Sequence, residues 1–101
     1  MEKRKPSYNL TLVQRSIGSA AGLSITIPAF RDAQALGFDR NAIIKTVLEM
    51  TPAMFYKSMT TFANHRLWQD VYHVTAGDLV LYVKFQADII AEFRIMSFKE
   101  L

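Results

Sequence analysis

The 101-residue sequence contains no cysteine, and it has only four glycines, three prolines and one tryptophan. Without cysteine the chain forms neither a disulfide bond nor a thiolate metal site, and a reducing compartment is consistent with that composition. No repeat or low-complexity tract divides the sequence. We therefore expect a single domain over residues 1–101, long enough to bury one modest core.

A long apolar run is also missing. The most apolar stretch, residues 20–30, is interrupted by glycine, serine, threonine and proline, and it is well short of the ~20 apolar residues that span a bilayer. The basic segment Met1–Lys5 is followed by proline and polar residues, where a secretion signal needs its apolar part. We expect a soluble, cytoplasmic protein with no membrane partner.

Acidic residues are in the minority. The sequence has nine Asp and Glu and twelve Lys and Arg, which gives a net charge of +3. This balance fits a polyanionic partner without requiring one. Ribosomal, RNA-cutting and DNA-binding roles stay open, whereas a strongly acidic substrate mimic is excluded.

Helical periodicity dominates the first half. A first helix, capped by Ser7 or Asn9 and ended by Gly18, has its apolar residues three and four positions apart: Leu10, Val13 and Ile17. The alternating segment Ser24–Ile27 is typical of a short strand, and Pro28 favours an edge position for it.

Two more helices are predicted before the middle of the chain. One runs from Phe30 to Leu36 and is closed by Gly37. Asp39 caps the next, which has an apolar face: Ile43, Ile44, Val47 and Leu48. Thr51-Pro52 begins a last helical turn.

Beyond Phe55 the period changes from 3.6 to 2, which predicts strands. Four are expected: Tyr56–Phe62, Leu67–Val74, Leu79–Gln86, and Ile89 or Ile90 to Phe98. The connections are short enough for hairpins: residues 63–66, 75–78 and 87–88. We predict an α+β fold with N-terminal helices packed on an antiparallel meander formed mainly by the C-terminal half.

Alternation separates two faces of this sheet. The third predicted strand buries one set: Leu79, Leu81, Val83 and Phe85. Its opposite face is polar and cationic, with Val80, Tyr82, Lys84 and Gln86, and neighbouring strands can add Lys57, Met59, Gln69, His73 and Lys99. Whether these side chains converge depends on strand register, which the sequence leaves open.

Such a set fits metal-free RNA cleavage, in which a 2′-hydroxyl attacks the neighbouring phosphate. The reaction needs a base, cations on the phosphate and an acid for the leaving oxygen. Lysine and tyrosine fill these roles only if their pKa values, ordinarily ~10.4 and ~10, are lowered by burial or by nearby cations. We expect clustered lysines to supply that lowering.

Plainer interpretations remain. Lysines on a sheet surface are usually solvated charges, and Tyr56, Trp68 and Tyr72 are the kind of residues that pack a core. His65 and His73 have no Asp or Cys at a ligand spacing, which argues against a zinc site. No phosphate-binding loop, dinucleotide-binding glycine pattern or catalytic carboxylate pair is found.

The segment Phe55–Thr61, with His65 and Trp68–Tyr72 after it, strongly resembles the motility quorum-sensing regulator toxins, the MqsR family. These are mRNA interferases of bacterial type II toxin–antitoxin systems. Three further segments are similar to family motifs: Met1–Pro6, Leu81–Lys84 and Ser97–Glu100. The match is close from about Phe55 onward and diffuse between Leu10 and Met54.

No set of His, Asp and Glu has a convincing ligand spacing, so we expect cleavage without a metal or another cofactor. The resemblance implies a RelE-like α+β fold and ribosome-independent cleavage of mRNA. The family's active-site Lys, Gln, Tyr and Lys fall on Lys57, Gln69, Tyr82 and Lys99; Met59, His73 and Lys84 are expected to bind substrate. It also implies a co-encoded antitoxin protein, expected to bind zinc and DNA, so that DNA is contacted only through the antitoxin.

This chain departs from the family pattern between Lys84 and Lys99, where it is slightly longer and lacks a histidine. The last hairpin is therefore expected to be longer or bulged, and the position of Lys99 depends on it. Two alternatives to the nuclease stay open. One is a catalytically decayed toxin-fold protein that acts with its antitoxin in transcriptional regulation, and the other is a housekeeping nucleic-acid-binding module.

Overall fold

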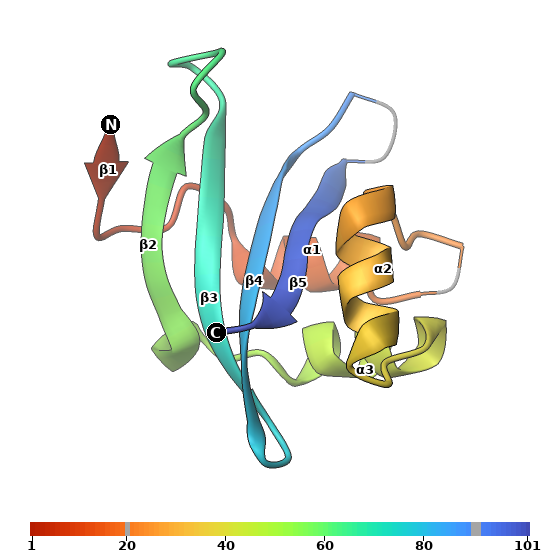
Figure 1. The fold of residues 1–101 in the computed structure, drawn as a ribbon. Coiled ribbons are helices and arrows are strands. Elements are labelled where there is room, and N and C mark those ends of the chain that lie inside the picture. Colours follow the sequence, from red (N-terminus) through yellow and green to blue (C-terminus); the bar gives the residue numbers. More distant parts are fainter. Residues whose placement is uncertain (20, 90–91) are drawn as a thin grey trace.

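The computed structural model describes residues 1–19, 21–89 and 92–101 (Figure 1). Its helices are α1 (Leu10–Ile17), α2 (Ile27–Ala35) and α3 (Arg40–Glu49), with a 3-10 turn at Pro52–Met54. Its strands are β1 (Glu2–Lys3), β2 (Phe55–Thr60), β3 (Trp68–Ala76), β4 (Leu79–Ala87) and β5 (Phe93–Glu100). The predicted α+β class is confirmed.

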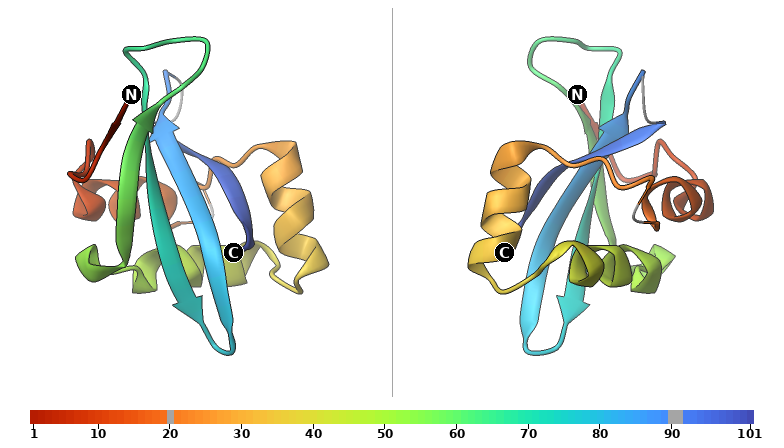
Figure 2. Two further views of the ribbon diagram at one scale, coloured as in Figure 1. Left: turned by 60° about the vertical axis from the view of Figure 1, so that its left-hand side comes forward. Right: turned by 90° about the vertical axis from the view of Figure 1, so that its right-hand side faces the viewer.

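The five strands form one antiparallel sheet in sequence order, β1-β2-β3-β4-β5, so the predicted meander is confirmed. Helices α1 and α3 lie behind the sheet, and α2 runs alongside the edge strand β5 (Figures 1 and 2). The face turned away from α1 and α3 is called the open face below, and the other is the covered face. Among the described residues, no helix is long and apolar enough to cross a membrane.

The helix boundaries follow the predicted capping residues. Asn9 accepts a hydrogen bond from the backbone amide of Leu12 at 3.2 Å and begins α1. Asp39 accepts one from the amide of Ala42 at 2.8 Å and begins α3. Gly37 has φ +89°, a left-handed conformation that favours glycine and ends the preceding helix.

The prediction of a strand over Ser24–Ile27 is wrong. Thr26 accepts a hydrogen bond from the amide of Ala29 at 3.3 Å, so Ile27 is already the first residue of α2. Pro28 lies in the first helical turn, where its missing N–H is tolerated. Only Ile25 pairs with the sheet, through an isolated parallel bridge to Ile95 of the edge strand.

The last strand begins later than the predicted start at Ile89 or Ile90. β5 begins at Phe93, and Ile89 is fully exposed in the preceding loop, while Ile90 lies outside the described residues. The loop closes where the amide of Asp88 donates to the carbonyl of Glu92 at 2.8 Å. The expectation of a longer or bulged hairpin is confirmed, because the β4–β5 register shifts between Lys84 and Phe85.

The core lies between the covered face and the helices. The predicted inward set on β4 is buried at Leu81, Val83 and Phe85, while Leu79 is only partly buried. Residues from both layers complete the core: Val13, Ile17, Ile43, Val47, Tyr72, Val74, Ile95 and Phe98. Each fully buried side chain of this size contributes about 1.5–3 kcal/mol, so the covered face supplies most of the stability.

Candidate active site

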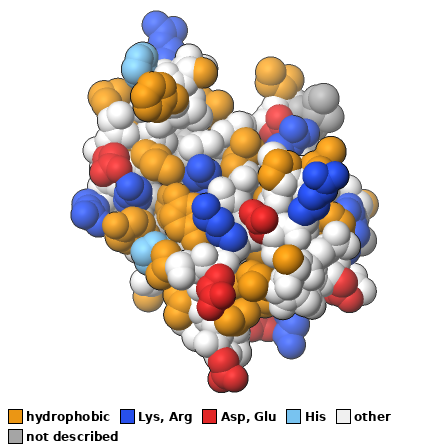
Figure 3. Space-filling view, viewed as in Figure 1, with side chains coloured by type: hydrophobic (Ala, Val, Ile, Leu, Met, Phe, Trp, Pro, Cys, Tyr) orange, Lys and Arg blue, Asp and Glu red, His pale blue; other side chains and the backbone are white. Residues whose placement is uncertain are grey.

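Strand register brings the expected site residues together on the open face. One cross-strand row contains Met59, Gln69, Gln86 and Arg94; the next contains Lys57, Val71, Lys84 and Ser97; and the third contains His73, Tyr82 and Lys99. The bulge in β5 inserts Met96 as an extra residue and leaves Lys99 directly opposite Tyr82. Basic, histidine and apolar side chains are interspersed over this side of the sheet (Figure 3).

A second bulge, at the start of β2, adds an aromatic residue to the open face. The β2–β3 register shifts between Phe55 and Lys57, and the ring of Tyr56 stacks on His73 with 4.1 Å between ring centroids. His73 in turn lies 6.2 Å from the ring of Tyr82. Strict alternation places Tyr56 and Lys57 on different faces of the sheet, so the sequence pattern did not assign Tyr56 to the open face. Tyr72 is buried in the core, as its residue type indicates.

Lys57 is held by a carboxylate that the sequence reasoning did not identify. Glu2 Oε1 lies 2.5 Å from Lys57 Nζ, in an ion pair whose Lys57 side chain is 22% exposed. The hydrogen bond from Lys57 and its positive charge lower the pKa of Glu2. The same hydrogen bond raises the pKa of Lys57, so this ammonium stays charged at neutral pH.

The N-terminal segment that carries Glu2 is anchored from the covered face. Asp70 is fully buried, and its carboxylate accepts hydrogen bonds from the backbone amides of Ser7 and Tyr8 at 3.0–3.1 Å. Nearer the chain start, Lys3 Nζ lies 4.1 Å from the centroid of the Trp68 ring. These contacts fix β1 against β2, with Glu2 beside Met59 in the register.

Tyr82 and Lys84 are half-buried neighbours on β4 with altered proton affinities. Burial raises the pKa of Tyr82, and nearby Lys57 opposes that shift, so the phenol keeps its proton at neutral pH. Burial lowers the pKa of Lys84, and the positive charge of Lys99 lowers it further. The expectation that clustered lysines lower the pKa values of this set is wrong for Lys57 and Tyr82, because a carboxylate and desolvation dominate there.

Gln69 occupies the row next to the lysines and is nearly buried, at 8% exposure. Its Nε2 donates to Gln86 Oε1 at 2.8 Å, which fixes the amide plane of both side chains. A fixed amide presents an oriented hydrogen-bonding group to a ligand on this face.

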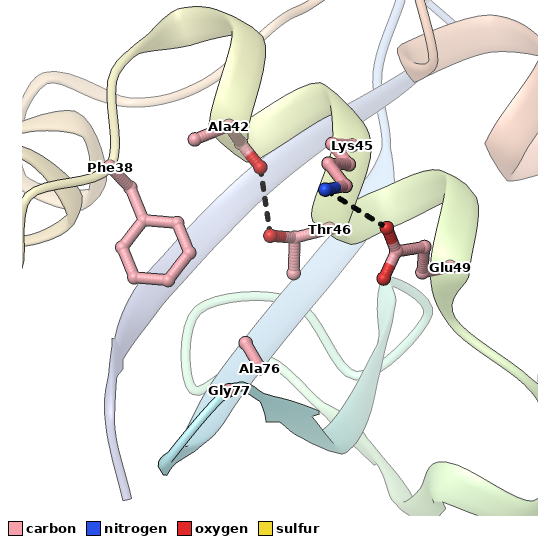
Figure 4. Close-up of a pocket in the computed structure, with 7 residues that line it drawn as sticks. All are labelled: Phe38, Ala42, Lys45, Thr46, Glu49, Ala76 and Gly77. Carbon is pink, nitrogen blue, oxygen red and sulfur yellow. Dashed lines mark hydrogen bonds and ion pairs between the residues drawn. The ribbon is translucent and has the colours of Figure 1, made fainter.

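The described residues offer no metal cluster and no pocket with free polar groups at α3 as an alternative to the open face. Within residues 1–19, 21–89 and 92–101, no group of three His, Cys, Asp or Glu residues is placed to hold a metal ion. A pocket of about 300 Å³ lies between α3 and the β3–β4 turn (Figure 4). Its polar groups bond one another: Thr46 Oγ1 donates to the carbonyl of Ala42 at 2.8 Å, and Lys45 pairs with Glu49 at 3.9 Å.

Comparison with known proteins identifies the family of this chain. The family model described as "Motility quorum-sensing regulator, toxin of MqsA" matches residues 5–100. The chain belongs to this toxin family. It is also similar to the mRNA interferase toxin MqsR of Escherichia coli (strain K12), with 35% identity over 100 residues that cover 99% of each chain.

The match to the motility quorum-sensing regulator toxins includes every residue that was expected to form the site, since all of them lie between residues 5 and 100. Glu2 lies just outside the matched range. Its place beside Lys57 is therefore learned from the geometry alone.

Proposed function

We propose that this chain is an mRNA interferase, the toxin of a bacterial toxin–antitoxin pair, and that it cuts mRNA without a ribosome, a metal or another cofactor. The observation that carries the proposal is the gathering of three lysines, a tyrosine and a glutamine on one accessible sheet face. The membership in a toxin family and the full-length similarity to an mRNA interferase toxin support it.

Cleavage proceeds by attack of the substrate's own 2′-hydroxyl on the adjacent phosphorus. The 2′-oxygen–phosphorus bond forms while the bond to the 5′-oxygen breaks, which leaves a 2′,3′-cyclic phosphate and a 5′-hydroxyl. Lys57 and Lys99 stabilise the charge that builds up on the phosphate oxygens. Tyr82 donates its proton to the departing 5′-oxygen. Its raised pKa keeps the phenol protonated at neutral pH, and the departing alkoxide is a stronger base than tyrosinate, so it can take this proton.

Substrate binding uses the rest of the open face. Gln69 orients the scissile nucleotide through its fixed amide, and Lys84 and Met59 contact the strand on either side of the cut. The stacked pair of Tyr56 and His73 offers a flat surface for an unpaired base, because base stacking on such rings is tolerant of sequence.

The partner proposed for this chain is an antitoxin protein that binds zinc and DNA, so that the toxin reaches DNA only through it. The family description "toxin of MqsA" supports a partner antitoxin, and its binding of zinc and DNA is part of the proposal. Cytoplasmic mRNA is the proposed substrate, which places the pair in the bacterial cytoplasm. A small neighbouring reading frame with a cysteine-rich segment and a DNA-binding segment is the expected gene context.

Incubation of the purified chain with a long RNA, followed by mapping of the product ends, tests this function. The expected result is a set of discrete internal cuts that Lys57→Ala abolishes. Lys45→Ala is the matched control, because Lys45 is an exposed lysine on α3. Intact RNA with retained antitoxin binding would show a decayed toxin, and RNA binding without cuts or antitoxin would show a housekeeping module.

A further inference from the structure

Two lysines of the same cross-strand row have opposite surroundings. Lys57 on β2 is bonded to Glu2, whereas the side-chain amine of Lys84 on β4 makes no hydrogen bond or ion pair with any residue that the structure describes. Val71 lies between them in the register and is completely buried, although it belongs to the open face. The two lysine stems therefore flank an apolar floor.

Lys84 lies within the open face, on a strand that is paired on both sides. Its cross-strand partners are Val71 and Ser97, and Tyr82 and Gln86 flank it on its own strand. Its side chain is half-buried, while Lys99 is exposed. A half-buried amine that has no counter-ion among the described residues and lies next to the proposed proton donor is well placed for proton transfer.

We propose that Lys84 is the general base of the cleavage reaction and that Glu2 is a positioning residue that keeps Lys57 a permanent cation on the scissile phosphate. This assignment rests on the function proposed above and extends the substrate-binding role given to Lys84. The neutral amine of Lys84 takes the proton of the attacking 2′-hydroxyl. After the leaving oxygen has received a proton from Tyr82, the Lys84 ammonium returns its proton to the tyrosinate through water, so no proton is gained or lost.

The electrostatics of the face agree with this division of roles. The lowered pKa of Lys84 increases the fraction of neutral amine at a given pH, whereas the raised pKa of Lys57 suppresses it. The pKa of Glu2 is lowered by Lys57, which makes this carboxylate a weak proton acceptor. The charged and titratable described residues that share the face with Lys84 are Glu2, Arg4, Tyr56, Lys57, His73, Tyr82, Arg94 and Lys99.

Single-turnover cleavage by Lys84→Ala, measured from about pH 6 to pH 10, tests the assignment. We expect the rate to fall about 10²- to 10⁴-fold, the usual contribution of a general base, and the rise of the wild-type rate with pH to be lost. Small primary amines should restore the variant in proportion to their free-base concentration, and more strongly basic amines should restore it better. Thermal melts of the same samples confirm that the variant is folded.

Lys57→Ala is the matched control for amine rescue. Because Lys57 acts as a charge, its rescue should follow the ammonium form and should weaken as pH rises. In Glu2→Gln, the cleavage rate should still rise with pH as Lys84 loses its proton. At higher pH the rate should fall, because Lys57 without its carboxylate partner then loses its proton as well. Lys45→Ala should cleave at the wild-type rate.

A substrate with sulfur in place of the scissile 5′-oxygen separates the base from the acid, since a thiolate leaves without a proton. Tyr82→Phe should regain most of its rate on this substrate, and Lys84→Ala should remain slow. Cleavage by Lys84→Ala within a few-fold of wild type, or its rescue by the ammonium form, would overturn the assignment of Lys84 alone. A wild-type protein that cuts no RNA would instead overturn the proposed function.

Discussion

The two faces of the sheet differ in whether their charged groups have hydrogen-bond partners, although the same strands form both faces. On the covered face, the carboxylate of Asp70 is fully buried and accepts hydrogen bonds from the amides of Ser7 and Tyr8. On the open face, the ammonium of Lys84 is half-buried and has no partner among the described residues. A satisfied buried charge stabilises a fold, whereas an unsatisfied cation costs stability and attracts an anion.

The contrast also separates the expected consequences of mutation. Changes on the covered face should lower stability and reduce activity only by unfolding the protein. Changes on the open face should reduce activity while the protein stays folded or becomes more stable. Each prediction below tests one side of this contrast.

Asp70→Ala is expected to have the largest effect on stability. It leaves two backbone amides without an acceptor, and each hydrogen bond to a charged group contributes about 1.5–3 kcal/mol. We predict a loss of about 3 kcal/mol or more in the free energy of unfolding, which chemical denaturation measures. A variant as stable as wild type would show that the N-terminal segment does not depend on this carboxylate.

Lys57→Ala and Lys99→Ala should each slow cleavage by roughly 10²-fold or more, by analogy with the removal of one transition-state hydrogen-bond donor. Both side chains reach the open face, where truncation costs little stability. Initial rates on a defined RNA, together with melting temperatures, give the measurement. A large drop in melting temperature would mean that these lysines support the fold, and a near wild-type rate would mean that they are only solvated.

Lys84→Met should raise the melting temperature at neutral pH while it lowers activity. The folded-state pKa of Lys84 is below that of an ordinary lysine, so at pH 7 the folded protein carries a penalised charge that methionine removes. Between the lowered pKa and the ordinary value near ~10.4, the unfolded chain binds more protons, and wild-type stability rises with pH. The gap between wild type and variant should therefore narrow as pH approaches 10, and a less stable variant at neutral pH would contradict this.

Removal of divalent metal ions should have the smallest effect of all. A site made of lysine, tyrosine and glutamine needs no metal to activate water, because the nucleophile belongs to the substrate. Cleavage in excess EDTA should match cleavage in buffer. Loss of activity in EDTA and its return with added metal would refute the proposed chemistry.

The sequence predicted the fold well where one local signal dominates. Alternation identified the strands around Lys57, Gln69 and Tyr82, and the side-chain caps at Asn9 and Asp39 located two helices. It failed at Ser24–Ile27, because four alternating residues are equally compatible with a capped helix start. The early start assigned to the last strand failed because the apolar Ile89 is in a loop rather than in the sheet.

The sequence predicted the residue types of the candidate site, but it predicted their geometry only in part. Lys57, Gln69, Tyr82 and Lys99 share one face, as alternation allowed, but their rows depend on two bulges. The bulge in β5 was expected from the length of the chain before Lys99, whereas no pattern in the sequence marks the bulge in β2. The β2 bulge brings Tyr56 to the open face. Glu2 was missed because a two-residue strand has no periodicity, and its contact with Lys57 joins residues 55 positions apart.

The central claim, that the open face cleaves RNA through the substrate's own 2′-hydroxyl, is tested most directly with a single 2′-deoxy substitution just upstream of the cut. This substrate should still bind, because the phosphate contacts that supply most of the affinity remain, but it should not be cut at that position. The unmodified RNA should give a 2′,3′-cyclic phosphate and a 5′-hydroxyl. Cleavage of the deoxy substrate at the normal rate, or products with a 3′-hydroxyl and a 5′-phosphate, would show that water is the nucleophile and contradict the roles given to Lys57, Tyr82 and Lys84.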